Sequence, residues 1–271
     1  MAPITPSSAE SIEQIKRALT VICILLVLSG SFWLIWIDQH RVVPVIMYHH
    51  IDETGRHPVA TVPTDHFEKH LRYLRDYQFE VLPYDDYIRA KQQGEHLSRK
   101  TVVLTFDDGY ADNYTNAFPL LRRYGYPAVM FISTDKVGQP GYVTWDQLRE
   151  MAAAGITIGS HAIAHEYLPG LPADRIAREI TESRRILEQR LGIPVRHFSY
   201  PVGGFNDEIK QLVRQAGYVS AVTTNRGFDR FNKDFYELNR VTMDEEDLVF
   251  PIRWAKFSGY YNLFRKAREP Q

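Results

Sequence analysis

The chain has 271 residues, 44% of them hydrophobic and 24% charged, and this balance excludes an intrinsically disordered protein. Its 32 Lys and Arg residues nearly equal its 33 Asp and Glu residues, so the net charge gives no attraction for nucleic acid, and we expect no nucleic-acid partner. The single cysteine, Cys23, excludes an intrachain disulfide, so the core alone must stabilise the fold.

The first predicted element is an apolar helix over residues 18–37, which contain no charged side chain. About 20 such residues are enough to cross the hydrocarbon core of a membrane. A cleaved secretory signal is the main alternative, but its apolar region is usually about 7–15 residues long, and here FWLIWI continues past the small residues at 29–31. We therefore predict an uncleaved transmembrane anchor, with Trp33 and Trp36 near one membrane interface.

The charges that flank this span predict its orientation. Lys16 and Arg17 precede it, whereas Arg41 is the one such charge in the four residues that follow it. Because positively charged flanks stay in the cytoplasm, residues 1–17 are predicted to be a cytoplasmic tail. The rest of the chain would then be periplasmic or extracellular, and the protein a single-pass membrane protein.

Short apolar runs alternate with helical patterns along the rest of the chain. The runs predict strands at residues 42–48, 102–106, 128–132, 156–160, 197–200, 219–223 and 238–243. Helices are predicted at residues 65–77, 112–124, 144–154, 173–191 and 207–216, and a glycine follows most of them as a C-terminal cap. This alternation predicts an α/β fold with a parallel sheet closed into a barrel, whose chemistry collects where the strands end.

Two of these strand ends carry groups that could bind a metal. Asp107 and Asp108 are adjacent carboxylates, whose mutual repulsion a bound cation would remove; an exposed acidic turn is the alternative. His161 and His165 are four residues apart and would share one face of a helix. Two His and one carboxylate fit a catalytic zinc with open positions, although Fe(II) oxygenases use the same types of ligand.

Two further strand ends carry weaker signals. Gly203 and Gly204 could let the backbone present N–H groups to an oxyanion, or could form an ordinary turn. His49 is a candidate acid or base near neutral pH. His50, the next residue along the strand, is expected to point the other way and to be structural or exposed.

The sequences TFDDGY, SHAIAH and YPVGG, in this order and spacing, resemble the motifs of the polysaccharide deacetylase family (carbohydrate esterase family 4), whose common unit is the NodB homology domain. VIMYHHI resembles the branch with an N-terminal YHxI motif, which includes poly-N-acetylglucosamine deacetylases. The similarity covers roughly residues 42–245. It implies a distorted (β/α)7-type barrel, predicted over residues 42–250, and leaves residues 251–271 as a C-terminal extension of unknown role.

The resemblance also implies roles for the residues that match the motifs. Asp107 corresponds to the general base, and the ligands of a divalent metal, usually zinc, correspond to Asp108, His161 and His165. His49 corresponds to the general acid of this branch, and no Leu-His pair after residue 205 competes for that role. The remaining predicted site residues are the backbone N–H of Val202 in the oxyanion hole and the substrate contacts Tyr110, Tyr200 and Pro201.

Two substitutions depart from the family pattern. Ala162 replaces a Ser or Thr, so we expect a hydrogen bond in its loop to be lost. Ser199 stands where many members have the Arg that orients the base. Arg240, at another strand end, could take over that role, and a structural or surface Arg is the alternative.

The implied activity is hydrolysis of N-acetyl groups on an N-acetylglucosamine-type polysaccharide outside the membrane. An O-acetyl esterase of the same fold and a non-catalytic, membrane-tethered carbohydrate-binding subunit are the alternatives. The complete Asp, Asp, His, His set counts against the second alternative. Besides the polymer and the membrane, proteins of exopolysaccharide synthesis or export are candidate partners.

Overall fold

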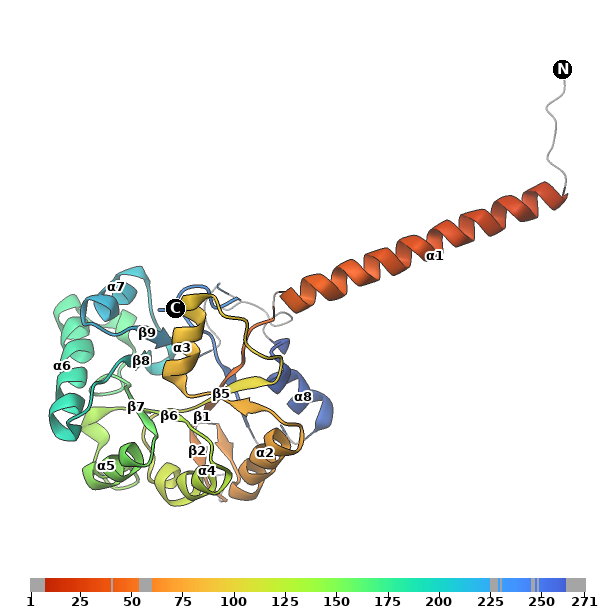
Figure 1. Cartoon of the computed structure of the whole chain (residues 1–271). Helices are drawn as coiled ribbons and strands as arrows, with labels where there is room; N and C mark the ends of the chain where they lie inside the picture. Colours follow the sequence, from red (N-terminus) through yellow and green to blue (C-terminus); the bar gives the residue numbers. More distant parts are fainter. Residues whose placement is uncertain are drawn as a thin grey trace. The chain divides into compact units, whose positions relative to one another are not determined.

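The computed structural model describes residues 8–39, 41–53, 60–224, 229, 231–244, 247 and 249–261. The chain forms two compact units, Met1–Arg41 and Val42–Gln271, and each is described by itself. The first unit contains helix α1 (Ser8–Gln39; Figure 1). Its stretch Lys16–Ile37 is long and apolar enough to cross a membrane, a property that a signal sequence near the N-terminus would share. The apolar helix predicted from the sequence is therefore present.

The second unit is built on a parallel sheet. Its strands lie in the order β10-β1-β5-β6-β7-β8-β9, and β4 pairs with the start of β5. The bounds are β1 Val45–Tyr48, β4 Glu80–Val81, β5 Thr101–Phe106, β6 Val129–Ile132, β7 Thr157–Ser160, β8 His197–Ser199, β9 Ser220–Val222 and β10 Val241–Thr242. A separate parallel pair consists of β2 (His50–Ile51) and β3 (Thr61–Val62).

One segment joins the two edges of the sheet. Leu238 forms a parallel bridge with Val222 of β9, and the N–H of Arg240 donates to the carbonyl of Thr224 over 3.1 Å. The next two residues form β10, which pairs with β1 on the opposite edge. The expected distorted β/α barrel is thus confirmed.

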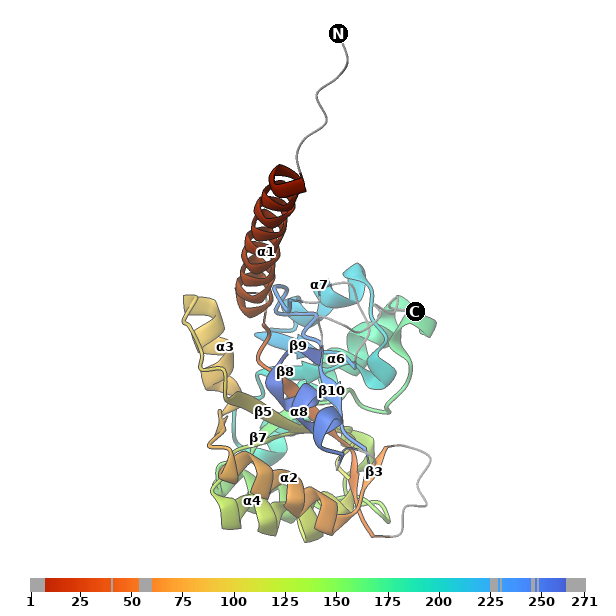
Figure 2. The same cartoon turned by 90° about the vertical axis from the view of Figure 1, so that its right-hand side faces the viewer.

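Helices lie around the outside of the strands (Figures 1 and 2). They are α2 Thr64–Asp76, α3 Tyr84–Gln93, α4 Phe118–Tyr124, α5 Trp145–Ala153, α6 Ala173–Leu191, α7 Asp207–Gln215 and α8 Phe250–Ser258. The expected glycine caps are present after α4 and α6, where Gly125 and Gly192 have φ of 67° and 69°. Short turns of other helix types precede or follow some strands: η1 Asn113–Ala117, η2 Thr134–Lys136, η3 Leu168–Gly170 and η4 Pro201–Gly203.

The inside of the barrel is filled by a small apolar cluster. Alternate residues of the strands supply it, because successive side chains of a strand point to opposite faces: Val45, Val103, Val129, Phe131 and Val222, joined by Leu238. Helix α3 adds Tyr84, Tyr87 and Ile88 to this cluster. The hydroxyl of Tyr84 accepts a hydrogen bond from Ser220, the first residue of β9, so α3 lies at the N-terminal end of the strands. The opposite end is left for polar groups.

Several short elements were not predicted from the sequence. Helix α3 has buried residues at 84, 87 and 88, and this helical spacing is the signal that identifies it. Strands β2, β3 and β4 have two residues each, too few for a periodic pattern. The single helix predicted at 112–124 instead begins with the wider turns of η1 before α4.

The C-terminal helix α8 also lies outside the prediction. Phe257 is fully buried in the main core, with its ring centroid 5.7 Å from that of Tyr73 on α2. The ammonium of Lys256 donates to the carbonyl of Thr242 over 2.9 Å and to the carboxylate of Asp247 over 2.7 Å. Residues 250–258 therefore belong to the same unit as the barrel, and the predicted boundary after residue 250 falls inside α8.

Candidate functional site

The predicted site residues gather at the C-terminal ends of the strands. Asp107 and Asp108 follow β5, His161 follows β7, and His49 lies between β1 and β2. Arg240 precedes β10, but its backbone N–H bonds to Thr224 just past the end of β9, and its fully buried side chain reaches Asp107. Because the strands are parallel, their C-terminal ends meet at one end of the barrel, and residues far apart in the sequence become neighbours.

Three of the predicted site residues bring their side chains together as the ligands of a metal would be. The candidate ligand atoms of Asp108, His161 and His165 all lie within 4.8 Å of one another. Oδ1 of Asp108 is 3.3 Å from Nε2 of His161 and 3.1 Å from Nε2 of His165. Within the described ranges, this buried Oδ1 has no partner with hydrogen-bond geometry. A cation between the three atoms would satisfy it, so the residues fit a divalent metal with nitrogen and oxygen ligands.

The surroundings prepare these groups for a cation. Nδ1 of His161 lies 2.7 Å from the carbonyl oxygen of Ser199 and must carry the proton that it donates, which leaves the lone pair of Nε2 facing Asp108. Burial would raise the pKa of Asp108, but the imidazoles of His161 and His165 outweigh it and hold this pKa well below its ordinary value. The carboxylate is therefore ionised.

The histidine motif lies on a loop and not on the helix considered from its spacing. Ala162 and His165 have φ of 63° and 60°, in the left-handed region that non-glycine residues rarely adopt. Asp108 also has a positive φ, of 73°. Each such residue costs on the order of 1 kcal/mol, and the surrounding contacts must offset that cost. The strained positions are those that aim the candidate ligands.

Glu179 supplies the contact that holds this loop, and sequence reasoning missed it. Its Oε2 accepts hydrogen bonds from the backbone N–H groups of Ile163 (2.8 Å) and Ala164 (2.9 Å). The side chain is only 3% exposed on α6. These bonds support the loop at the point where Ala162 cannot offer a hydroxyl. The available signal was a charged residue on the apolar face of the helix predicted at 173–191, three positions after Ile176.

Asp107 is held by Arg240 in a two-point ion pair. Nη1 and Nη2 of Arg240 lie 2.7 and 2.5 Å from the two carboxylate oxygens. The same guanidinium donates to Ser199 Oγ (3.0 Å) and to the carbonyl of Thr223 (2.9 Å). Burial alone would raise the pKa of Asp107, but Arg240 and His161 hold it below its ordinary value. The structure thus brings Arg240 to Asp107 and excludes a surface position for it.

His49 faces the same group of charges. Its imidazole interacts electrostatically with Asp107, Asp108, Arg240 and His161, and burial is the main cause that lowers its pKa. In the described part of the chain, its buried Nδ1 has no hydrogen-bond partner. An imidazole nitrogen without a protein partner in a polar site is available to a ligand.

His50 points away from these charges, as neighbouring residues of an extended chain do. Its Nδ1 lies 2.5 Å from Oδ2 of Asp112, and its ring stacks on Tyr110 with centroids 3.5 Å apart. The Asp112 carboxylate also accepts from the backbone N–H of Ile51 over 3.1 Å. His50 is therefore a buried structural residue that fixes the segment carrying His49.

The turn Pro201–Gly203 contains Val202 with φ of 57° and a side chain that is 47% exposed. The next two amides close the turn, since Gly203 N–H donates to the carbonyl of Tyr200 and Gly204 N–H to that of Pro201. A Cβ at Gly203 would collide with the Thr224 side chain. Close packing is thus one reason for glycine here, and the strained Val202 amide belongs to the turn at the end of β8.

The three predicted substrate contacts differ in exposure. Tyr200 is fully buried, and its hydroxyl donates to the carbonyl of Tyr236 over 2.9 Å. Pro201 is buried as well. We therefore do not propose the side chain of either residue as a contact. Tyr110 lines a cleft of about 240 Å³ together with Asp108, Ser133, Lys136, Tyr142, Ala164 and His165.

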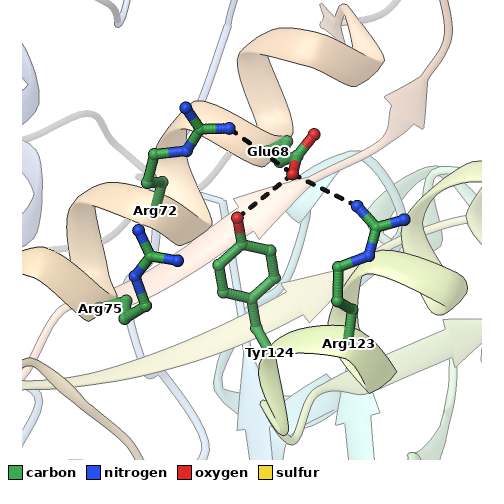
Figure 3. Close-up of a pocket in the computed structure, with 5 residues that line it drawn as sticks. All are labelled: Glu68, Arg72, Arg75, Arg123 and Tyr124. Atoms are coloured by element: carbon green, nitrogen blue, oxygen red, sulfur yellow. Dashed lines mark hydrogen bonds and ion pairs between the residues drawn. The ribbon is translucent and has the colours of Figure 1, made fainter.

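A second cleft, of about 460 Å³, lies between α2 and α4 (Figure 3). Glu68 is at its centre, where it accepts a hydrogen bond from Tyr124 (3.3 Å) and pairs with Arg123 (3.4 Å) and Arg72 (3.7 Å). Arg75, which also lines it, pairs with Asp76. Each guanidinium has a carboxylate partner, so this is an ion-paired surface and none of the predicted site residues line it.

Comparisons with known proteins identify the family of the chain. Residues 94–221 match the family model described as polysaccharide deacetylase. The Bacillus subtilis protein YxkH, provisionally named a polysaccharide deacetylase, is 34% identical over 208 residues, which cover 76% of this chain and 74% of that protein. The poly-β-1,6-N-acetyl-D-glucosamine N-deacetylase of Staphylococcus aureus is 23% identical over 212 residues, 73% of each chain.

Solved structures are similar over most of the chain. The Streptococcus pyogenes deacetylase PplD, in complex with acetate, has a TM-score of 0.70 and 27% identity and covers 78% of this chain and 97% of its own. IcaB from Ammonifex degensii has a TM-score of 0.70 and 25% identity, with coverages of 80% and 97%. The motifs, the barrel and these relatives agree, and the chain belongs to the polysaccharide deacetylase family.

Proposed function

We propose that this enzyme is a zinc-dependent N-deacetylase of an N-acetylglucosamine-type polysaccharide. The convergence of Asp108, His161 and His165 beside the Asp107–Arg240 pair is the observation that carries the proposal. The named activity of the Staphylococcus aureus relative supports the choice of substrate. Two imidazoles and one carboxylate, with space left for water and substrate, are a usual catalytic zinc set.

When bound, the metal would polarise the acetyl carbonyl and make a neighbouring water more acidic. Asp107 is the group that accepts the proton of this water. Its Oδ2 lies 3.9 Å from Nε2 of His161, so the base is next to the ligand set without belonging to it. Arg240 and Ser199 donate hydrogen bonds to its two carboxylate oxygens and fix its orientation. Ionised and fixed, Asp107 can act as a general base.

In its protonated form, His49 is the group that delivers a proton to the leaving nitrogen. Expulsion of an amine anion is very unfavourable in water, so an amide hydrolase needs an acid at this point. His49 lies among the site charges, and no protein group of the described chain occupies its buried Nδ1. The acetyl oxygen, which becomes negative during attack, would be held by the N–H of Val202.

The anchoring of the enzyme is a further part of this proposal. We infer that residues 18–37, within the apolar stretch Lys16–Ile37 of α1, stay in the membrane as a span, with the catalytic unit outside the cytoplasm. The positive charges at Lys16 and Arg17 support this orientation. Proteins of exopolysaccharide synthesis or export would then be neighbours of the same membrane.

The test is release of acetate from matched N-acetylated and O-acetylated oligosaccharides, before and after removal of metal with a chelator. The proposal predicts N-deacetylation that is lost on chelation and restored by zinc. Faster release from the O-acetylated substrate would identify an esterase instead. Restoration by iron alone would overturn the choice of metal.

A further inference from the structure

Helix α8 presents an apolar outer face. Large apolar side chains at its start and middle are about half exposed: Val249 55%, Phe250 53%, Ile252 41% and Trp254 48%. Pro251, between them, is exposed as well. Among the described residues of the barrel unit, the other large hydrophobic side chains with such exposure are Tyr77 and Val202. A contiguous apolar patch on a folded domain usually marks a surface that another apolar phase covers.

The inner face of α8 is fixed to the barrel. Phe257 is fully buried, and Lys256 is held by Thr242 and Asp247. Arg253, between the exposed positions, lies over the ring of Tyr73 at 4.6 Å. The exposed residues are therefore presented by an ordered helix, and their exposure does not come from a frayed end.

The end of α8 lies beside the residue at which the chain enters the barrel unit. The N–H of Val42, the first residue of that unit, donates to the carbonyl of Gly259 over 3.4 Å. Gly259 is the C-terminal cap of α8. The candidate span ends at Ile37, so four residues, 38–41, connect it to Val42. The five Cα-to-Cα steps from Ile37 to Val42 extend to at most about 18 Å. A bilayer that holds the span is therefore within that reach of the end of α8.

From these two observations we propose that the outer face of α8 docks into the interface of the bilayer in which the span is anchored. The inference rests on the anchoring proposed above. Trp254 and Tyr260, with ring centroids 6.1 Å apart, are the aromatic types that favour the membrane–water boundary. Docking would add a second attachment next to the short connection and so restrict rotation of the barrel at the surface.

The arginine-lined cleft of Figure 3 is a weaker candidate for the membrane contact. The cleft lies between α2 and α4 and is not lined by any residue of α8, which packs against Tyr73 on α2. Its guanidinium groups are already paired with Glu68 and Asp76. An anionic headgroup would have to compete with these carboxylates, and the cleft offers no apolar surface comparable to that of α8.

The test places one fluorescent label on the full chain in liposomes. In a Cys23→Ser background, Ile252→Cys carries the probe on α8, and Arg185→Cys carries it at a half-exposed position on α6 as the matched control. Lipids with brominated acyl chains quench probes that enter the interface by about 5–10 Å. We expect several-fold quenching at residue 252 and almost none at residue 185. A contact with a second copy of the chain would not depend on brominated lipid.

A second variant tests the apolar face itself. Phe250→Glu combined with Trp254→Glu should abolish quenching at residue 252, while the thermal unfolding temperature stays near that of the parent, because both side chains are exposed. Quenching that survives this change, or that is equal at 252 and 185, overturns the docking. Flotation of the chain with liposomes separates the two proposals: a chain that floats with a water-exposed label refutes docking alone, and a chain that does not float refutes the anchoring as well.

Discussion

Each end of the barrel holds a buried histidine beside a carboxylate, and the two ends differ in how the histidine is satisfied. At the N-terminal end, Nδ1 of His197 lies 2.9 Å from Ser220 Oγ, and its Nε2 lies 3.2 Å from Asp85 Oδ1. At the C-terminal end, Nε2 of His161 faces an oxygen of Asp108 that has no partner with hydrogen-bond geometry among the described residues. The first network is complete, whereas the second leaves an oxygen that a bound cation would satisfy.

This difference separates structure from function better than residue types do. Ser220, His197 and Asp85 have the residue types of a catalytic triad, yet Ser220 is fully buried and its hydroxyl donates to Tyr84. No substrate can reach that hydroxyl. At the C-terminal end, the candidate metal ligands converge beside a cleft. Three of the residues there have strained backbones: Asp108, Ala162 and His165. The active end is marked by polar side chains that converge beside a cleft and leave a buried oxygen without a hydrogen-bond partner among the described residues.

The largest expected difference is between two variants, each of which removes one histidine from one end of the barrel. His161→Ala should lower bound metal from about one ion per chain to nearly none and reduce turnover by at least about 10³-fold, because the metal supplies several kcal/mol of transition-state stabilisation. His197→Ala should leave metal content and turnover of the folded enzyme close to those of the parent. It should instead lower the free energy of unfolding by about 1–3 kcal/mol, since it leaves buried polar partners unpaired.

Elemental analysis, acetate release and denaturant unfolding distinguish these outcomes. Loss of metal in His197→Ala with normal folding would break the comparison between the two ends. Asp108→Ala should behave as His161→Ala does. Full metal occupancy in both ligand variants would refute the site.

A smaller effect is expected for His49, which is next to the ligands but not one of them. His49→Ala should lower turnover on an N-acetyl substrate by about 10²–10⁴-fold, the usual contribution of a general acid. Metal content should stay near that of the parent. On an activated ester, whose leaving group needs no proton, the loss should shrink to a small factor. Equal losses on the two substrates would indicate binding or structure in place of acid catalysis.

His50→Ala is the matched control for this experiment. Because His50 pairs with Asp112 and stacks on Tyr110, its loss should clearly lower the unfolding temperature, while the turnover of the folded enzyme falls only slightly. A larger loss of turnover in His50→Ala than in His49→Ala would show that the wrong histidine carries the acid role.

Glu179 sharpens the comparison further, because it supports the active end without touching the ligand atoms. Glu179→Ala removes the acceptor of two backbone N–H groups of the histidine loop. Supporting residues of this kind typically change metal affinity by about 10–100-fold, and we expect a loss in that range. Glu179→Gln keeps one acceptor oxygen and should recover part of it. Metal titration checks both, and an unchanged affinity in Glu179→Ala would show that the loop holds its shape without the carboxylate.

The barrel was predictable because it depends on repeated local patterns. The seven predicted strand runs all contain observed strands or bridges, since each is an apolar segment with a turn after it. Helix α8 and strands β2 and β3 were missed. The buried face of α8 packs against residues that are far away in the sequence, and the two strands are too short to show a periodic pattern.

The candidate site was predictable where a motif names the residue. Asp107, Asp108, His161 and His165 come from such motifs, and the structure brings them together. The pairing of Arg240 with Asp107 spans 133 positions, so the sequence could only offer it as one of two alternatives. Tyr200 shows the converse limit, because a motif gives position but not exposure, and its side chain is in the core.

The smallest expected effect concerns pH and the N-terminal end of the barrel. Burial lowers the pKa of His197 below its ordinary value, although Asp85 acts in the opposite direction. Below an ordinary pKa of about 6.5, the unfolded chain therefore binds a proton that the folded chain resists, and stability falls as the pH falls. Until the folded pKa is reached, each pH unit costs up to about 1.4 kcal/mol. His197→Gln, which cannot titrate, should thus lose less unfolding free energy between pH 7 and pH 5 than the parent does. Denaturant unfolding of both proteins at these two pH values measures the difference. An identical pH dependence would mean that protonation of His197 does not contribute to the pH dependence of stability.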